Sequence, residues 1–304
     1  MYPGKVSVIM PNYNYGRYIS ESIQAVLSQT HGDVELIVID DCSKDNSVEI
    51  LREWEKKDPR VIVLANQANR GAAASQNLAL EKVSGDFMAL CDADDVWYPQ
   101  KLETQLAIMA RNPKVGLVHS QATIVDSQGK STGQEFTKTY SAATPRKSGN
   151  VFDQIIRTNY LCSSSTLLRR ECLDYAGEFH TQLRYLYDWT YWVRVARKYE
   201  FAFVAEPLLS YRIHGASTAL DGPGYNTARI TAAELILQAF PDLQSKYQAQ
   251  LFYLLGTNQL ALGRRQNAHS SFANSLLSAP WKCKTWIRWA QTLAAPNEGM
   301  QTTR

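Results

Sequence analysis

The first hundred residues alternate short apolar runs with segments of helical spacing, and this alternation is the strongest constraint on the fold. The segment after the first run, for example, carries Ile19, Ile23 and Val26 at helical intervals. Strands that alternate with helices form a parallel sheet through right-handed crossovers, so we predict a doubly wound α/β domain. Pro11 is expected to end the first strand. The predicted strands are Lys5–Met10, Val34–Ile39, Val61–Leu64 and Phe87–Leu90.

Polar clusters follow each of these four predicted strands. In parallel α/β sheets, ligands bind at the carboxyl ends of the strands. Because all four clusters fall at such ends, we predict a ligand site along this edge of the sheet. The clusters are Pro11–Asn14, Asp40–Asp41, Asn69–Gly71 and Asp92–Asp95.

The fourth cluster places three carboxylates within four residues, at Asp92, Asp94 and Asp95. Such carboxylates repel one another, and their hard oxygen ligands suit Mg²⁺ or Mn²⁺. A cation held there could bind phosphate oxygens and offset the charge of a departing diphosphate. The alternative is a solvated acidic turn that caps a helix starting near Pro99. The stretch alone leaves both interpretations open.

The glycine pattern argues against two common nucleotide folds. A dinucleotide-binding domain should carry G-x-G-x-x-G after its first strand, and here Pro11–Gly16 follows instead. The chain also has no G-x-x-x-x-G-K-S/T sequence. We therefore expect the sheet to hold a nucleotide without a glycine loop around its phosphates, which leaves the phosphates to a metal.

In order and spacing, these segments resemble the inverting family 2 glycosyltransferases of the GT-A fold. The resemblance covers the N-terminal half and rests on Val6–Asn14, Ile39–Asp45, Asn69–Gly71 and Asp92–Asp95. It implies a Rossmann-like GT-A domain that transfers a sugar from a nucleotide-diphosphate donor to an acceptor hydroxyl, with inversion and a divalent cation.

The resemblance also implies roles for single residues. Tyr13 is expected to stack on the base, Asp41 to accept from a ring N–H, and Arg70 to lie near the base or phosphates. Asp92 is expected near the ribose. The metal ligand is expected to be Asp94, or Asp95 if the motif is aligned one residue further along the chain. The implied nucleotide-binding set is Pro11, Tyr13, Asn14, Asp41, Arg70, Asp92 and Ala93.

Two stretches of the second half extend the resemblance. The sequence around Tyr187–Asp188 resembles the family's acidic pair before a helix, with tyrosine in place of the first acid. The family's retained acid is the general base, so the resemblance assigns that role to Asp188. Leu209–Ser217 resembles a Y-R-x-H-x-x-S ending whose residues approach the diphosphate, which implicates Arg212 and His214.

The chemistry of an inverting transfer suits Asp188. The acceptor hydroxyl must lose its proton as it attacks, and one carboxylate suffices as base. The aromatic neighbours of Asp188 should raise its pKa towards working pH by desolvation. The residues alone favour a simpler role as the cap of a helix beginning at Trp189. Acceptor contacts are expected from Trp97, Tyr187 and Trp189, although Trp97 could instead pack under the metal loop.

Composition bounds the remaining possibilities. A net charge of +3 gives no case for nucleic acid. The five cysteines are odd in number and form no C-x-x-C, so we expect neither a disulfide framework nor a zinc site. No run reaches about 18 apolar residues. These features favour a cytoplasmic enzyme.

The C-terminal region is predicted to be helical. We expect a catalytic domain over residues 1–222 and a helical region over 223–304, with one tetratricopeptide-like hairpin at 249–282. Residues 225–304 hold eight Lys/Arg against three Asp/Glu, and Trp281, Trp286 and Trp289 lie among the cations. Docking on the catalytic domain is the simpler interpretation. A peripheral contact with the inner face of a membrane is its rival.

The sequence thus predicts an inverting transferase that uses a UDP- or dTDP-linked sugar, a divalent cation, and a saccharide or lipid-linked acceptor in cell-surface polysaccharide or glycolipid synthesis. One rival is a nucleotidyltransferase, which should carry a Gly-rich, Lys/Arg-containing loop where Pro11–Gly16 lies. Another is an inactive nucleotide-binding scaffold that acts through its helical tail. The segment Leu161–Leu168 is expected to form a strand beneath the acceptor.

Overall fold

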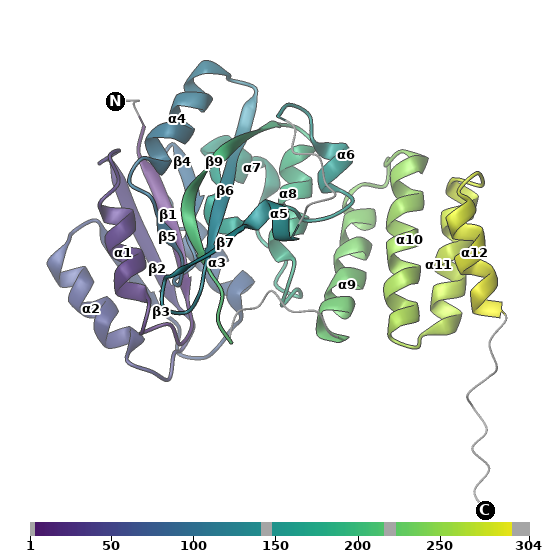
Figure 1. Cartoon of the computed structure of the whole chain (residues 1–304), viewed down its shortest axis with the longest axis horizontal. Coiled ribbons are helices and arrows are strands. Elements are labelled where there is room, and N and C mark those ends of the chain that lie inside the picture. The colour runs from purple at the N-terminus through teal and green to yellow at the C-terminus, as the bar shows by residue number, and fades with distance from the viewer. Residues whose placement is uncertain (1–3, 141–147, 216–222, 294–304) are drawn as a thin grey trace, which may run out of the picture. The chain divides into compact units, whose positions relative to one another are not determined.

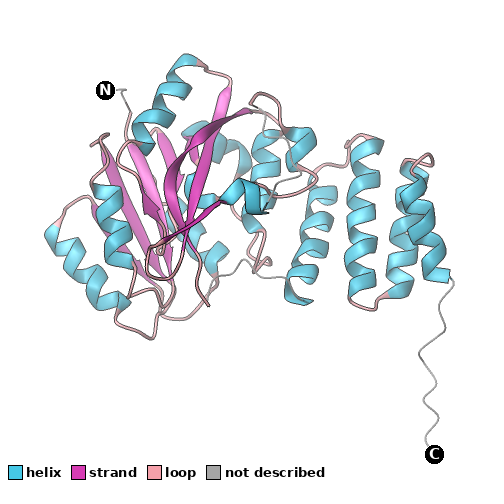
Figure 2. Cartoon of the chain, in the orientation of Figure 1, coloured by secondary structure: helices cyan, strands magenta, loops and turns pink. Residues whose placement is uncertain are grey.

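The chain divides into two compact units, Met1–Ser217 and Thr218–Arg304. The computed structural model describes residues 4–140, 148–215 and 223–293. Figure 2 shows one sheet with its helices in the first unit, and only helices in the described part of the second. The domain boundary expected at residue 222 lies outside the described residues and stays a prediction.

Four strands at one side of the sheet are parallel, as the alternating sequence predicts. They lie in the order β3-β2-β1-β4 (Figure 1). All seven residues of β2 are buried, which is typical of a central strand covered on both faces. The carboxyl ends of these strands therefore lie along one edge. Their bounds are β1 Val6–Asn12, β2 Val34–Asp40, β3 Val61–Ala65 and β4 Phe87–Leu90.

The first strand does not end at Pro11, as the sequence predicted, but continues to Asn12. The backbone groups of Ile9 point to β4, where the carbonyl of Ile9 accepts from the N–H of Cys91. Pro11 points to the same side, two residues further on. The pairing with β4 ends at Ile9 and Leu90, so no neighbouring strand needs the N–H that proline lacks.

The rest of the sheet is mixed. Strand β8 is antiparallel to both β4 and β6, and it therefore joins the parallel part to the second half of the chain. Beyond β6 lie β9 and β5, and β7 pairs with β6. The bounds are β5 Val96–Trp97, β6 Val115–Val125, β7 Ser131–Glu135, β8 Leu167–Arg169 and β9 Glu200–Arg212.

Helices accompany the strands throughout the first unit. Helix α3 follows Gly71, whose φ of 84° lies in the left-handed region that glycine adopts without strain. The bounds are α1 Ile19–Leu27, α2 Ser47–Lys57, α3 Ala72–Leu80, α4 Lys101–Arg111, α5 Phe136–Tyr140, α6 Phe152–Ile155, α7 Arg170–Ala176 and α8 Tyr187–Ala196, with a 3₁₀ turn η1 at Ser163–Ser165.

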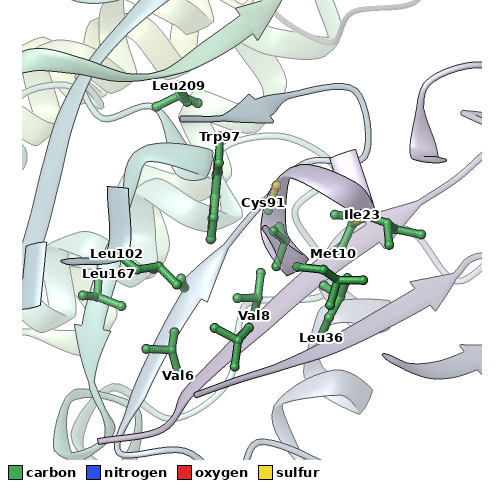
Figure 3. Close-up of a cluster of buried hydrophobic side chains, with 14 of the residues drawn as sticks. Val6, Val8, Met10, Ile23, Leu36, Cys91, Trp97, Leu102, Leu167 and Leu209 are labelled. Carbon is green, nitrogen blue, oxygen red and sulfur yellow. The ribbon is translucent and has the colours of Figure 1, made fainter. Parts of the chain in front are cut away.

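A buried apolar cluster packs the sheet against α1 and α4. Figure 3 shows part of it, including Met10 and Leu36 from the parallel strands and Leu102 from α4. Cys91 and Trp97 also belong to it, so the residues on both sides of the three carboxylates are anchored in the core. The loop that carries the carboxylates is therefore fixed at both ends.

A buried ion-pair network closes the opposite edge of the parallel strands. Glu35 is only 6% exposed and pairs with the ammonium of Lys5 at 2.5 Å. Its carboxylate also accepts from the Ser7 hydroxyl and from the backbone N–H of Ser84 at 2.8 Å. Burial acts to raise the pKa of Glu35, but the hydrogen bonds from Lys5, Ser7 and Ser84 lower it to about 2. The ionised carboxylate thus stabilises the fold.

Glu35→Gln is expected to destabilise the protein by about 3 kcal/mol at pH 7, because it removes a buried charge that several donors satisfy. Since the folded-state pKa is depressed, the contribution is present above the usual value of 4.5 and is lost as pH falls towards 2. Urea unfolding at pH 7 and pH 3 should therefore show a smaller difference between variant and wild type at pH 3. An equal difference at both pH values would contradict this account.

The second unit consists of helices in its described part. These are α9 Pro223–Ala239, α10 Ser245–Ala261, α11 Arg265–Ser278 and α12 Cys283–Leu293. Gly256 allows α10 and α11 to approach, because a Cβ there would lie 2.7 Å from the Phe272 ring. The tetratricopeptide assignment itself stays a prediction. Within the described residues, no helix combines the length and apolar character needed to cross a membrane.

Candidate active site

The ends of β1 and β2 are joined by a polar network on the nucleotide side predicted from the sequence. Asp40 is fully buried and accepts from the amide of Asn12 at 2.6 Å and the hydroxyl of Ser43 at 2.6 Å. Asn14, with φ of 61°, accepts from the N–H of Lys44 at 2.7 Å. This network shapes the loop in which Pro11 is half-buried and Tyr13 is exposed, with its ring available for stacking.

Asp41 organises the start of α3. Its Oδ1 accepts from the N–H of Arg70 at 2.8 Å and from the Asn66 amide at 2.9 Å, and its Oδ2 accepts from the N–H of Gly71 at 2.8 Å. An acid at a helix N-terminus is favourable. The bonds hold the Arg70 backbone beside Asp41, while the Arg70 side chain is exposed. The structure therefore brings these two predicted residues together.

The three carboxylates after β4 lie in different environments. Asp95 is 1% exposed and Asp94 is 9% exposed, while Asp92 is half-buried; Ala93 between them is fully buried. Burial, Asp94 and Asp188 raise the pKa of Asp92 to about 7. Burial and the carboxylates of Asp94 and Asp92 raise the pKa of Asp95. The loop therefore holds more buried negative charge than its own residues neutralise.

Arg212 and His214 reach this loop from β9 and the residues after it. The Arg212 side chain donates to the Asp94 carbonyl at 2.8 Å and to the Glu21 carboxylate at 2.7 Å, and its backbone N–H donates to Asp95. His214 Nε2 lies 2.9 Å from Oδ2 of Asp94. Arg212 is 3% exposed, so it supports the loop from within, and its contact with a diphosphate stays a prediction.

The carboxylate loop fits a divalent cation by its chemistry. It offers hard oxygen donors whose mutual repulsion a cation would relieve. Asp94 is the better placed of the two predicted ligands, because it is more exposed than Asp95. Among the described residues, no group of three or more His, Cys, Asp or Glu side chains is arranged as a metal site. A cation there would therefore need ligands beyond the described side chains, and phosphate oxygens of a bound nucleotide would suit it.

Asp188 lies in the first turn of α8, half-buried. Its Oδ2 accepts from the Asn159 amide at 2.8 Å and from the Ser163 hydroxyl at 3.0 Å, and its Oδ1 accepts from the N–H of Trp189 at 2.8 Å. Burial raises its pKa, and these hydrogen bonds act against burial. Asp188 also raises the pKa of Asp92. The adjacent residues Ser163 and Ser164 contact Asp188 and the N–H of Asp92, so the predicted base lies close to the donor-side loop.

The three aromatic residues predicted at the acceptor side differ in position. Tyr187 is half-buried, and its hydroxyl accepts from the Gln76 amide at 2.9 Å. Trp97 and Trp189 are 2% and 1% exposed, and their indole N–H groups donate to the carbonyls of Ser164 and Ile155. Both indoles are core residues, which for Trp97 favours packing under the loop. Their contact with an acceptor stays a prediction.

Sequence reasoning missed the residues that hold the carboxylates. The strand expected over Leu161–Leu168 is wrong in its first part: η1 occupies Ser163–Ser165, and β8 begins at Leu167. Ser163 contacts Asp188, and the Ser164 hydroxyl accepts from the N–H of Asp92 at 2.9 Å. A run of three serines is a turn signal, because their hydroxyls compete for backbone groups, and it could have identified this site.

The fold is shared with solved transferases. Staphylococcus aureus TarS in complex with UDP superposes with a TM-score of 0.65 at 19% identity, covering 91% of this chain and 81% of that chain. The Pyrobaculum calidifontis mannosyltransferase PcManGT in complex with GDP-Man and Mn²⁺ gives a TM-score of 0.57 at 19% identity, covering 96% and 86%. These likenesses show a GT-A-like fold, as the sequence predicted.

The sequence is also similar to glycosyltransferases. A Nostoc sp. glycosyltransferase is 34% identical over 227 residues, 71% of this chain and 67% of that protein. TuaG of Bacillus subtilis, described as a teichuronic acid biosynthesis glycosyltransferase, is 45% identical over 104 residues, 34% of this chain and 41% of that protein. The model of glycosyl transferase family 2 matches residues 7–175, and the chain belongs to this family. It is a glycosyltransferase.

The five cysteines are all free thiols in this structure.

Proposed function

We propose that this enzyme transfers a sugar, with inversion and with the help of Mn²⁺ or Mg²⁺, from a UDP- or dTDP-linked donor to an acceptor hydroxyl. The observation that carries this proposal is that the carboxylate loop and Asp188 are contacted by adjacent residues, Ser164 and Ser163, at the carboxyl edge of the parallel strands. A donor diphosphate at the loop would place its anomeric carbon on the side from which Asp188 can assist an attacking hydroxyl.

The proposed reaction is a single displacement. The acceptor O–H bond breaks as its proton passes to Asp188, and the oxygen forms the new bond to the anomeric carbon. The bond between that carbon and the diphosphate oxygen breaks, and the diphosphate leaves with the electron pair. The raised pKa of Asp188 brings this carboxylate closer to the basicity that proton transfer near neutral pH requires. A divalent cation at Asp94 or Asp95 would offset the charge of the leaving diphosphate.

Residues of the first two polar clusters would hold the nucleotide. Tyr13 is 43% exposed and can stack on a base, and the exposed Arg70 can pair with phosphate or base oxygens. Asp41 has one acceptor position left on Oδ2, which suits a ring N–H. TarS with UDP and PcManGT with GDP-Man and Mn²⁺ support a nucleotide-sugar and a metal in this fold.

The biological setting is also part of the proposal. The similarity to TuaG supports the synthesis of a cell-surface polysaccharide or glycolipid, with a saccharide or lipid-linked acceptor. The free thiols are typical of a reducing compartment, so we place the reaction on the cytoplasmic side.

Calorimetric titration of the full chain with UDP, dTDP and GDP, with and without Mn²⁺, tests this proposal. We expect UDP or dTDP to bind only when Mn²⁺ is present, because the buried carboxylates repel a diphosphate without it. Failure of the folded protein to bind any of the three nucleotides would contradict the proposal. Equal affinity with and without Mn²⁺ would contradict its metal dependence.

We also propose that the second unit contacts an anionic membrane surface through α12. Ile287 and Leu293 on this helix are 60% and 62% exposed, and Trp281 just before it is 71% exposed. Lys284 and Arg288 lie on the same helix, and the sequence between Asp242 and Glu298 contains no acid. Exposed apolar side chains beside cations are typical of an interfacial helix.

Co-sedimentation with lipid vesicles tests the membrane contact. The protein should bind vesicles containing phosphatidylglycerol several-fold better than pure phosphatidylcholine, and Lys284→Gln with Arg288→Gln should remove most of that preference. Arg264→Gln with Arg265→Gln removes the same charge at the start of α11 and serves as the matched control. If both pairs lower binding equally, or neither does, α12 is not the contact.

A further inference from the structure

The short segment Cys162–Thr166 is unusually well supplied with hydrogen bonds. Within the segment, the carbonyl of Cys162 accepts from the N–H and hydroxyl of Ser165 at 2.9 and 2.6 Å. The carbonyl of Ser163 accepts from the N–H and hydroxyl of Thr166 at 3.1 and 2.7 Å. We call this segment the serine turn. Its internal bonds fix the backbone that carries Ser163 and Ser164.

The next three carbonyls of the serine turn are held from β5 and α4. Trp97 Nε1 donates to the Ser164 carbonyl at 2.9 Å, and Gln105 donates to the Ser165 carbonyl at 2.7 Å. Lys101 Nζ lies 3.5 Å from the Thr166 carbonyl and 3.8 Å from the centroid of the Trp97 ring. These donors are buried, so water does not compete for their bonds. The serine turn is therefore rigid on its core side.

The other side of the serine turn contacts both halves of the site. The Ser163 hydroxyl donates to Oδ2 of Asp188, and the Ser164 hydroxyl accepts from the N–H of Asp92. Because consecutive Cα atoms are only about 3.8 Å apart, the two contacts fix Asp188 relative to the donor-side loop. Hydrogen bonding by Ser164 also acts to lower the pKa of Asp92 and of Asp95.

The two oxygens of Asp188 are not equivalent. An ionised carboxylate oxygen has about two acceptor positions. Oδ2 uses both, for Asn159 and Ser163, whereas among the described residues Oδ1 accepts one hydrogen bond from another residue, the N–H of Trp189. An incoming hydroxyl therefore finds an acceptor position on Oδ1 and none on Oδ2.

We infer that Ser163 and Asn159 are positioning residues that make Oδ1 of Asp188 the atom that takes the proton of the acceptor hydroxyl. This inference rests on the proposed role of Asp188 as the base. The proton moves from the acceptor oxygen to Oδ1, and the electron pair of that O–H bond forms the new glycosidic bond. The serine turn holds Oδ1 at a fixed distance from the donor, because its neighbour Ser164 holds the loop of Asp92.

Ser163→Ala provides the test. It removes a hydrogen bond to the charged form of Asp188, so the acidic limb of kcat/KM for the acceptor should move up by about one pH unit, at saturating donor and Mn²⁺. The charged and titratable neighbours that act on this limb are Asp92 and Tyr187, and neither is altered. Calorimetric nucleotide affinity should stay within about threefold of wild type, and Ser163→Thr, which keeps the hydroxyl, should restore the profile.

Ser165→Ala is the matched control, because its hydroxyl bonds to the Cys162 carbonyl, and the backbone N–H of residue 165 still holds that carbonyl and the turn after the substitution. It should lower stability without moving the limb. An unchanged limb in Ser163→Ala, or an equal shift in Ser165→Ala, would overturn the inference. Failure of the proposed function gives a separate result. If Asp188 is not the base, Asp188→Asn keeps its transfer activity, and the acidic limb of the kcat/KM profile does not report the pKa of Asp188.

Discussion

Replacing Asp188 by asparagine should lower the rate of sugar transfer by about 10³-fold while nucleotide binding stays nearly unchanged. A positioned general base contributes roughly 10²–10⁴-fold, and asparagine cannot accept a proton at neutral pH. The amide also places two donors where the Trp189 N–H, the Asn159 amide and the Ser163 hydroxyl already donate, so one of these bonds must be lost. The loss should appear in kcat, because the base acts as the hydroxyl attacks.

Two measurements separate this effect from misfolding. Calorimetric binding of the nucleotide with Mn²⁺ should give the wild-type affinity within about threefold, because the binding residues lie on other elements. Asp174→Asn is the matched control: it removes a carboxylate from the neighbouring helix α7, where the side chain is largely exposed. Transfer by Asp188→Asn within tenfold of the wild-type rate would exclude Asp188 as the base.

Asp94→Ala should weaken metal-dependent nucleotide binding by roughly 100-fold or more. Loss of a group that only supports a metal ligand typically costs 10–100-fold in metal affinity, and a direct ligand should cost at least as much. Asp94 is the more exposed of the two predicted ligands, and His214 holds its carboxylate at 2.9 Å. Titration of UDP against enzyme at fixed Mn²⁺ measures the change.

Asp95→Asn tests whether Asp94 or Asp95 is the metal ligand. Asp95 is almost fully buried, and its Oδ1 accepts from the backbone N–H of Arg212, a bond that an asparagine oxygen can also make. We therefore expect Asp95→Asn to weaken Mn²⁺-dependent binding by less than tenfold. If Asp95→Asn loses the metal dependence and Asp94→Ala keeps it, Asp95 is the ligand.

The parallel part of the sheet was predictable from the sequence because its information is local. Each strand from β1 to β4 is mostly apolar, and each polar cluster lies at the end of its strand or within a few residues of it. The contact between Asp41 and the Arg70–Gly71 turn follows from that geometry, since β2 and β3 are neighbours. The error at Pro11 arose because the end of β4, which makes the missing N–H harmless, cannot be read from β1.

The second half was harder to predict because its contacts are distant in sequence. The motif assigns Arg212 to the diphosphate, which stays a prediction. The structure buries its side chain against Glu21 and the Asp94 carbonyl, more than a hundred residues away. The serine turn has too few residues for any periodicity. Its importance comes from partners such as Trp97 and Asp188, which no local pattern connects.

The three-residue strand β8 has a consequence for synthesis on the ribosome. It lies between β4 and β6 and pairs with both. These two strands are synthesised before β8, so the edges that β8 will pair stay unpaired until Leu167–Arg169 has left the exit tunnel. Until then the nascent chain exposes two unpaired strand edges, which are sites for aggregation. The serine turn arrives with β8 and before Asp188, so the turn that holds the base is in place before the base itself is synthesised. Slowing translation once Leu167–Arg169 has left the exit tunnel should therefore favour productive folding more than slowing it at codon 100.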